Sequence, residues 1–362
     1  MRRWFVGGGL ALCAFAFGCH REIEMVPLAE RTIYITDRFY DVEAVSKDHA
    51  VVVGYGGKIL ATANGGMTWE IRSSGVETAL YAVQFTDDQH GWIAGQDGLI
   101  LHTADGGKTW QPQESAATYS DKGGGTFKAY LFGLYALDNQ RAWAVGDRSA
   151  LTSTTDGGKT WRGRKVAVQQ EDITGGESIA AADPVFYDVR FTDPQHGWIV
   201  GEFGKILRTE DGGETWREQQ HSLMEGTGIF DPLDLPTLFG IHVRSPEAAV
   251  AAGLEAHLAR TTDGGRRWTY DKIESGDVAL VDPLFAAYET ASGDGWAVGT
   301  AGQVVHKVAG ETVWKPAQLG QDVLTWLRSV DFSDDQNGWM VGGYGLIFRT
   351  TDGGKSWLPS QG

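Results

Sequence analysis

The chain has 362 residues, of which 50 are glycine and 14 are tryptophan, and its formal net charge is −16. Frequent glycine together with tryptophan is typical of all-β folds built from many short strands and tight turns. A surface this acidic repels phosphate backbones, so nucleic acid is excluded as an expected partner.

An export signal is predicted at residues 1–18. Arg2 and Arg3 precede an apolar run from Trp4 to Gly18, which is shorter than the roughly 20 residues of a membrane span and fits a signal-peptide core. Small residues at positions 16 and 18 place the cleavage before Cys19, where a bacterial lipoprotein carries its lipid. We therefore expect an exported, periplasmic protein that is lipid-anchored through Cys19, with residues 19–31 as a short linker. Plain secretion is the alternative, and the paired arginines fit a twin-arginine signal as well as general secretory export.

The cysteine and histidine content argues against a metal or disulfide framework. Cys13 lies inside the signal, so the mature chain keeps only Cys19. The nine histidines show no ligand spacing on one element. We expect no metal, no cofactor and no disulfide within the chain.

A repeated unit of four short strands runs through residues 32–362. In the second unit the strands are expected near residues 80–86, 91–95, 99–103 and from 109 onward. A second-strand position and a closing tryptophan lie 18 residues apart in each unit, as in Trp92 and Trp110. The seven closing tryptophans are Trp69, Trp110, Trp161, Trp216, Trp268, Trp314 and Trp357. Four-stranded units at this spacing predict one seven-bladed β-propeller over residues 32–362.

Most units close with the Asp-box (BNR repeat) pattern Ser/Thr-x-Asp-x-Gly-x-Thr/Ser-Trp. The acidic or amide side chain can cap backbone N–H groups of its own turn, and the tryptophan is large enough to fill the gap between blades. The residues at this position are Asn64, Asp105, Asp156, Asp211, Asp263 and Asp352. The sixth unit has lost the box and kept Trp314. A role repeated in almost every blade indicates a structural function for these residues, in preference to catalysis or metal binding.

The segment Thr32–Thr36 is predicted to complete the last blade. It alternates in polarity, and only five residues follow Trp357. An N-terminal strand in that position would close the ring and remove an exposed sheet edge.

Over about residues 32–360 these motifs resemble the photosystem II stability/assembly factor family. Its members are exported seven-bladed propellers with Asp-box turns and a His/Asn-Gly-Trp start of the second strand, as at His90-Gly91-Trp92 and Asn337-Gly338-Trp339. The resemblance implies a non-catalytic protein that binds a membrane-protein partner during assembly or maintenance of a membrane complex. It also implies a basic patch, which the acidic charge of this chain opposes. We expect a monomer.

Two alternatives follow from the Asp-boxes, which also occur in sialidases and some endoglucanases. These are a carbohydrate-active hydrolase of sialidase-like type and a glycan-binding lectin. A sialidase-like site usually has an Arg-Ile-Pro motif near its start, and this sequence has none. With 47 acidic residues, any chosen carboxylate pair would carry no information. No catalytic residue is therefore assigned.

Long connections between units are the first candidates for a binding surface. Residues 111–130, 162–185 and 217–237 are expected on the face opposite the Asp-boxes. The last connection carries apolar residues among Gly, Pro and Asp, and long loops of this kind are often functional. Its candidate binding residues are Met224, Phe230, Leu233 and Leu235. The alternative is that these side chains fold back onto the blades.

Two sets of residues at equivalent positions are further candidates. An aromatic set near the channel mouth would grip a peptide or a sugar, and it consists of Tyr40, Tyr81, Phe132, Tyr187, Phe239 and Phe285, with Arg328 as the seventh member. A cationic set on the third strands would bind carboxylates, and it consists of His102, Arg208, Arg260, His306 and Arg349. The alternatives are packing between blades for the first set and local ion pairs for the second.

Overall fold

The structure is a computed structural model that describes residues 31–120, 123–169, 183–276 and 279–360. The predicted signal peptide at 1–18 and nearly all of the linker at 19–31 lie outside these residues. Thr32–Gly362 forms one compact unit. Within the part of the chain described, no helix is long and apolar enough to cross a membrane.

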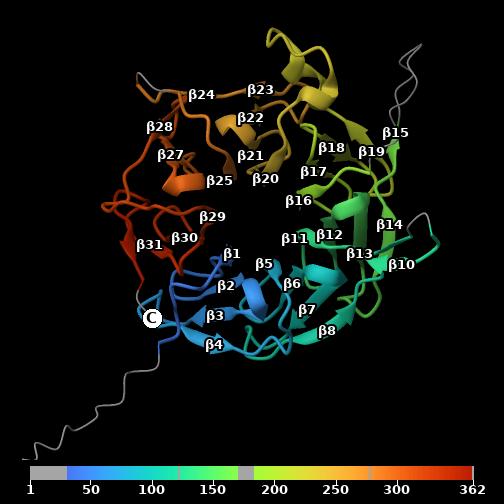
Figure 1. Cartoon of the computed structure of the whole chain (residues 1–362), viewed down its shortest axis with the longest axis vertical. Coiled ribbons are helices and arrows are strands. Elements are labelled where there is room, and N and C mark those ends of the chain that lie inside the picture. Colours follow the sequence, from blue (N-terminus) through green and yellow to red (C-terminus); the bar gives the residue numbers. More distant parts are fainter. Residues whose placement is uncertain (1–30, 121–122, 170–182, 277–278, 361–362) are drawn as a thin grey trace, which may run out of the picture. The chain divides into compact units, whose positions relative to one another are not determined.

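Seven antiparallel sheets follow one another around a central channel (Figure 1). The inner strands are β1 (Phe39–Glu43), β5 (Leu80–Phe85), β11 (Leu131–Ala136), β16 (Phe186–Phe191), β20 (Leu238–Val243), β25 (Leu284–Glu289) and β29 (Leu327–Phe332). The second strands are β2 (Ala50–Gly54), β6 (Gly91–Gly95), β12 (Ala142–Gly146), β17 (Gly197–Gly201), β21 (Ala249–Gly253), β26 (Gly295–Gly299) and β30 (Gly338–Gly342). The predicted all-β, seven-bladed propeller is confirmed.

The outer half of each blade is shorter. The third strands are β3 (Ile59–Thr62), β7 (Leu99–Thr103), β13 (Ala150–Thr154), β18 (Ile206–Thr209), β22 (Leu258–Thr261), β27 (Val304–Lys307) and β31 (Ile347–Thr350). The fourth strands are β4 (Glu70–Arg72), β8 (Gln111–Glu114), β14 (Arg162–Lys165), β19 (Trp216–Glu218), β23 (Thr269–Tyr270), β28 (Val313–Pro316) and β32 (Leu358–Pro359). Blades four and six gain a fifth, parallel strand from β15 (Val168–Gln169) and β24 (Lys272–Ile273), and β9 (Thr118–Ser120) pairs with β10 (Thr126–Lys128) in a separate hairpin.

The core lies between neighbouring blades. Every residue of the second strands is buried, and every closing tryptophan is at most 7% exposed. Between blades three and four, for example, Trp143 stacks on Phe191 with ring centroids 3.7 Å apart, and Trp216 packs in the same cluster. The tryptophans therefore fill the gaps between blades, as predicted.

The Asp-box turns have the predicted structural role, with a contribution from threonine that the sequence did not suggest. In blade four the buried Thr209 hydroxyl accepts the Gly213 N–H at 2.9 Å and donates to Asp211 at 2.8 Å. Asp211 in turn accepts the Thr215 N–H at 2.9 Å. Asn64 makes the equivalent bond to the Thr68 N–H at 3.0 Å.

A second turn motif pins the Asp-box to its own blade. Between the first and second strands, Asp193 accepts the N–H groups of Gln195 and His196. The Gln195 carbonyl then accepts the Gly212 N–H of the Asp-box at 2.9 Å. The same carboxylate cap recurs at Asp87, Asp138 and Asp334. These turns and the Asp-boxes therefore share one face of the ring.

The hairpins between the second and third strands lie on the other face, together with the connections between blades. A Cβ added at Gly302 would lie 2.3 Å from the Val323 carbonyl oxygen, and one at Gly204 would lie 2.5 Å from Leu235 Cβ. In both cases a glycine of a hairpin turn lies against the connection that follows the same blade. The predicted separation of faces is confirmed, and we call the face with the connections the open face.

The predicted strand at Thr32–Thr36 is wrong. The outer strand of blade seven is β32, which pairs with β31, so all four strands of this blade come from the C-terminal part of the chain. The N-terminal segment instead turns, with the Asp37 N–H bonded to the Tyr34 carbonyl at 2.9 Å. Its Ile33 packs against the core between blades seven and one. Two residues after Trp357 are enough to form the outer strand, which leaves no place for another.

Candidate functional site

Exposed apolar side chains gather on the open face. Among the described residues, the large apolar side chains on its hairpin turns and connections with at least 36% exposure include Tyr34, Ile35, Tyr55, Phe127, Phe230, Leu233, Val281, Leu324 and Tyr344. An exposed apolar side chain contributes nothing to the core, and several on one face are typical of an interaction surface.

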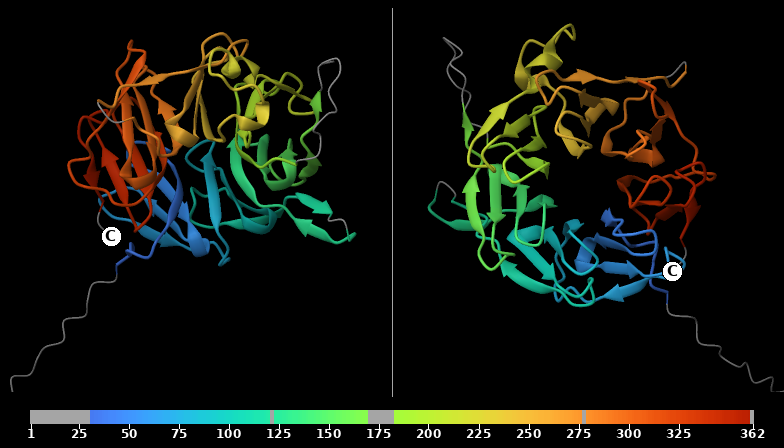
Figure 2. Two further views of the ribbon diagram at one scale, coloured as in Figure 1. Left: turned by 45° about the horizontal axis from the view of Figure 1, so that its top comes forward. Right: turned by 180° about the vertical axis from the view of Figure 1, so that it is seen from behind.

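The connection from 217 to 237 projects from the ring (Figures 1 and 2), and its side chains are buried at the base and exposed at the tip. It contains the 3-10 turns η4 (Gln220–Met224) and η5 (Pro232–Asp234). Leu223 is buried, and the Ser222 hydroxyl accepts the Trp268 N–H of blade five at 2.8 Å. Phe230 is 91% exposed, and Leu233 is 36% exposed. The fixed base holds these two side chains away from the blades.

Two predicted binding residues of this connection serve the core instead. Leu235 is 3% exposed and belongs to the cluster between blades four and five. Met224 is partly buried against the same cluster. The prediction is therefore corrected for Leu235, because its contact with the turn at Gly204 closes the base of the loop.

The aromatic set lines the mouth of the central channel on the open face. Neighbouring ring centroids are 5.0–5.6 Å apart along the series Tyr40, Tyr81, Phe132, Tyr187, Phe239 and Phe285. Arg328 completes the circle with its guanidinium carbon 5.1 Å from the Phe285 centroid. These side chains pack on one another across blade boundaries and also line the cavity, so the predicted packing is present, and their binding of a ligand stays a prediction.

Arg328 interrupts the aromatic set with a cation. Its Nη1 donates to the Phe285 carbonyl at 3.3 Å, and no carboxylate among the described residues lies within 4.0 Å of it. Burial lowers its pKa, although Asp41 and Asp188 oppose this effect. The remaining N–H donors make this position suited to an acceptor group that approaches the mouth.

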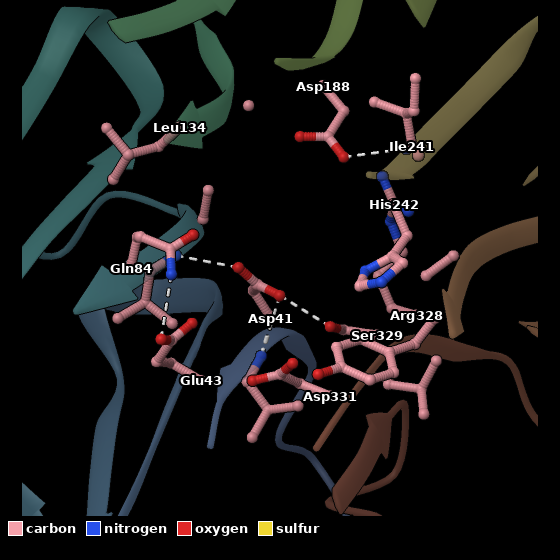
Figure 3. A pocket seen from close by; sticks show the side chains of 18 of the residues that line it. Asp41, Glu43, Gln84, Leu134, Asp188, Ile241, His242, Arg328, Ser329 and Asp331 are labelled. Atoms are coloured by element: carbon pink, nitrogen blue, oxygen red, sulfur yellow. Dashed lines mark hydrogen bonds between the residues drawn. The ribbon is translucent and has the colours of Figure 1, made fainter. Parts of the chain in front are cut away.

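Four carboxyl groups lie deeper in the channel, whose cavity volume is about 370 Å³ (Figure 3). They are Asp41, Glu43, Asp188 and Asp331. Burial raises the pKa of all four, and that of Asp331 reaches about 7. Burial and the charge of Arg190 lower the pKa of His242 to about 4, so its imidazole is neutral at pH 7.

Three of these carboxylates connect neighbouring blades through backbone N–H groups. Asp41 accepts Val83 N–H at 2.9 Å, Asp188 accepts Ile241 N–H at 3.0 Å, and Asp331 accepts Ala44 N–H at 2.7 Å. Asp188 also forms an ion pair with Arg190 at 2.7 Å. The sequence prediction missed this role. The acidic residues at regular positions of the inner strands were a signal, but only closure of the ring shows their partners.

The cationic set does not face an open binding surface. Arg208 lies over the Trp198 ring at 4.8 Å, and Arg349 lies over Trp339 at 6.0 Å. Arg260 forms ion pairs with Asp271 at 2.7 Å and Glu289 at 2.6 Å. The prediction of a carboxylate-binding ring is corrected for Arg260, because carboxylates of this chain already occupy its guanidinium. Arg208 and Arg349 stack on the second-strand tryptophans between blades.

Blade six replaces its missing Asp-box with a buried ion pair. Lys307 stands at the position of the Asp-box threonine and pairs with Glu289 at 3.2 Å. Its Nζ also donates to the Gly293 carbonyl at 3.1 Å. Glu289 therefore joins Arg260 of blade five to Lys307 of blade six. No group of three or more potential metal ligands occurs within the described ranges.

Comparisons with known proteins agree with this architecture. The family profile described as "Photosynthesis system II assembly factor YCF48" matches residues 22–121 and 177–234. The chain is 30% identical over 210 residues to "Photosystem II assembly lipoprotein Ycf48" of Synechococcus sp. (strain CC9902). That alignment covers 46% of this chain and 58% of the relative, so the chain spans less than two thirds of that relative's length.

Solved structures share the fold at low identity. The structure titled "YCF48 bound to D1 peptide" matches with a TM-score of 0.63 and 19% identity, over 88% of this chain and 94% of that chain. A GH74 xyloglucanase from Xanthomonas campestris matches with a TM-score of 0.68 and 13% identity, over 92% of this chain and 55% of that one. Together with the family profile, these findings confirm the resemblance that the motifs predicted: the chain is a seven-bladed propeller, and parts of its sequence are similar to photosystem II stability/assembly factors.

Proposed function

We propose that the chain is an exported, lipid-anchored and non-catalytic propeller whose open face binds a segment of a membrane-protein partner during assembly or maintenance of a membrane complex. The observation that carries the proposal is Phe230, which is 91% exposed on a loop whose base is held in the core. A structural relative is titled as bound to a D1 peptide, which supports a peptide segment as the ligand.

The chemistry of the open face suits such a segment. Binding energy concentrates in a few apolar anchors surrounded by polar groups, and Phe230 with Leu233 supplies anchors of this kind. At the channel mouth Tyr187 offers an aromatic wall, and the remaining N–H groups of Arg328 would donate hydrogen bonds to a carboxylate or a backbone carbonyl. Arg208 and Arg349 would contribute only through the packing of their blades.

The binding loop is tested by replacing Phe230 and Leu233 together with serine. Co-purification of a partner from solubilised membranes should be lost, while the melting temperature stays within about 2 °C, because both side chains are exposed. Leu358→Ser is the matched control, since Leu358 is 68% exposed on the outer edge of blade seven. Retained co-purification in the double variant, or equal loss in the control, contradicts the proposed surface.

The anchor is tested separately by Cys19→Ser. The variant should move from the membrane fraction to the soluble periplasmic fraction, because an acyl chain contributes about 0.8 kcal/mol per buried methylene group. Unchanged fractionation, with no lipid on the wild-type protein by mass spectrometry, would instead indicate plain secretion.

A carbohydrate-active hydrolase is the second candidate. Buried channel carboxyls with raised pKa values and the fold shared with a xyloglucanase favour it. Against it, Asp41, Asp188 and Asp331 already accept backbone N–H groups that join the blades. The hydrolase would be established if the protein releases reducing sugar from xyloglucan and if Asp331→Asn abolishes this release. Glycan-array binding without turnover would identify a lectin.

A further inference from the structure

We infer that a second surface of the open face, at the junction of blades seven and one, docks on the interface of a lipid bilayer. The surface consists of Tyr34, Ile35, Tyr55, Leu324 and Tyr344, and we call it the blade 7–1 rim. The inference extends the lipid anchor of the proposed function, since it assigns a surface of the folded propeller to the membrane itself.

The rim is continuous because the segment 33–38 runs between two hairpin turns. The Tyr55 N–H of the blade-one turn donates to the Arg38 carbonyl at 2.9 Å. On the other side the Gly345 N–H of the blade-seven turn donates to the Asp37 carbonyl at 2.9 Å. A Cβ at Gly345 would lie 2.4 Å from the Tyr34 carbonyl oxygen, so no side chain separates the segment from this turn.

Leu324 extends the rim on the far side of blade seven. The next two residues of its connection adjoin the hairpin turn, because a Cβ at Gly343 would lie 2.5 Å from the Thr325 hydroxyl and 3.0 Å from the Trp326 ring. Trp326 then stacks on Tyr40 of the channel mouth at 5.9 Å. The rim is therefore supported from below and presents its apolar side chains outward.

The exposure of these side chains is unusual for a monomer surface. Leu324 is 89% exposed, Ile35 75%, and Tyr344 61%. Tyrosine beside aliphatic residues and basic groups is typical of surfaces that enter the headgroup region of a bilayer.

The local charge at the rim also permits contact with lipid, although the whole chain is acidic. Lys58 and Asp37 neutralise each other in an ion pair of 3.0 Å. Arg38 stacks on Tyr55 at 5.6 Å and, in the part of the chain described, has no carboxylate within 4.0 Å. The net charge of −16 should repel anionic headgroups, so we expect the rim to prefer zwitterionic lipid.

The position of the chain favours a bilayer over another occupant. The compact unit begins at Thr32, directly before the rim residues. Cys19 lies 13 residues upstream, and a fully extended chain of this length spans at most about 45 Å. An anchor at Cys19 would therefore keep the rim at high effective concentration near the membrane surface. The Phe230 loop lies on the opposite side of the ring (Figure 1) and would stay free for a partner.

Single-cysteine labelling tests the rim without the anchor. The mature chain with Cys19→Ser contains no other cysteine, so a polarity-sensitive dye can be placed at one position at a time. Ile35→Cys, Leu324→Cys and Tyr344→Cys report the rim. Phe230→Cys reports the opposite side of the open face, and Met67→Cys, at a site 72% exposed, reports the Asp-box face.

Phosphatidylcholine vesicles should shift the dye emission to shorter wavelength at the three rim positions and leave it unchanged at 230 and 67. In unlabelled chain, Ile35→Ser with Leu324→Ser should lower the vesicle partition coefficient about tenfold or more. Equal shifts at all five positions, no shift at the rim, or a short-wavelength emission at the rim before vesicles are added would overturn the inference. The last outcome would show that protein covers the rim. Failure of Cys19→Ser to change fractionation would contradict the anchor and leave this result unaffected.

Discussion

Replacing Asp331 with asparagine should stabilise the propeller at pH 8 and leave its stability almost unchanged at pH 4. Asp331 is buried in the channel, and burial together with the nearby Asp41 carboxylate raises its pKa from 3.8 to about 7. Asparagine keeps an oxygen that can accept the Ala44 N–H, which Asp331 now binds at 2.7 Å. The substitution therefore removes the buried charge and keeps the bond that joins blades seven and one.

The expected size follows from the change in pKa. In the unfolded chain Asp331 ionises near pH 4, and in the folded protein near pH 7. Between these values the folded state binds more protons, so wild-type stability falls as the pH rises from about 4 to 7. The full change corresponds to about 4 kcal/mol, and because Glu43 competes for the same proton we expect a gain of about 2–4 kcal/mol for the variant at pH 8.

Urea unfolding followed by tryptophan fluorescence at pH 4, 6 and 8 measures this difference. Asp331→Ala is the first control, since it loses the acceptor for Ala44 and should be destabilised by about 1–3 kcal/mol relative to Asp331→Asn at every pH. Asp105→Asn is the second control. Hydrogen bonds from Thr109 lower the pKa of Asp105 to about 2, so the stabilising effect of its charge is lost only as the pH falls from about 4 to 2. The difference in stability between wild type and Asp105→Asn should therefore stay the same at pH 4, 6 and 8. A pH-independent difference between wild type and Asp331→Asn would refute the reasoning.

Three further substitutions test the structural roles assigned above by the same unfolding assay. Thr209→Val should lower the free energy of unfolding by about 1–3 kcal/mol, because the buried Gly213 N–H loses its acceptor. Asp211→Ala should lower it less, since its exposed cap contributes about 1 kcal/mol. The reverse order would contradict the assignment. Ala301→Gly should stabilise by about 1 kcal/mol, because the exposed Ala301 has a φ of 53°, and a loss of stability would contradict this account of backbone strain. Glu289→Ala should destabilise by about 3 kcal/mol, since Lys307 and Arg260 lose a buried partner; a neutral result would show that water replaces it.

The repeats predicted the fold because each feature of a blade depends on local chemistry. The 18-residue spacing from Trp92 to Trp110 and the glycines of the Asp-box are set within one unit. The prediction failed where the answer depended on the closed ring. Two segments, Thr32–Thr36 and the residues after Trp357, compete for the single free edge of β31. This competition decides which of them forms the outer strand of blade seven.

The candidate site was predictable only in part, for a related reason. The exposed position of Phe230 follows from a long loop with Gly, Pro and Asp, but the burial of Leu235 in the same loop depends on its contact with Gly204. The cationic set has a regular spacing in sequence, yet Arg260 meets Glu289 across a blade boundary. The carboxylates at Asp41 and Asp331 are 290 residues apart and share one cavity only after the ring closes.

The two surfaces proposed for the open face lie on different parts of the ring. The Phe230 loop belongs to the connection before blade five, and the blade 7–1 rim lies across the channel from it. A contact at one side could orient the other only if the blades between them stay in register. The backbone bonds of Asp41, Asp188 and Asp331 to the next blade provide that stiffness at the centre. Under the two proposals made above, the channel carboxylates would keep the two surfaces in a fixed arrangement, and this stiffness would offset the cost in stability of burying them near neutral pH.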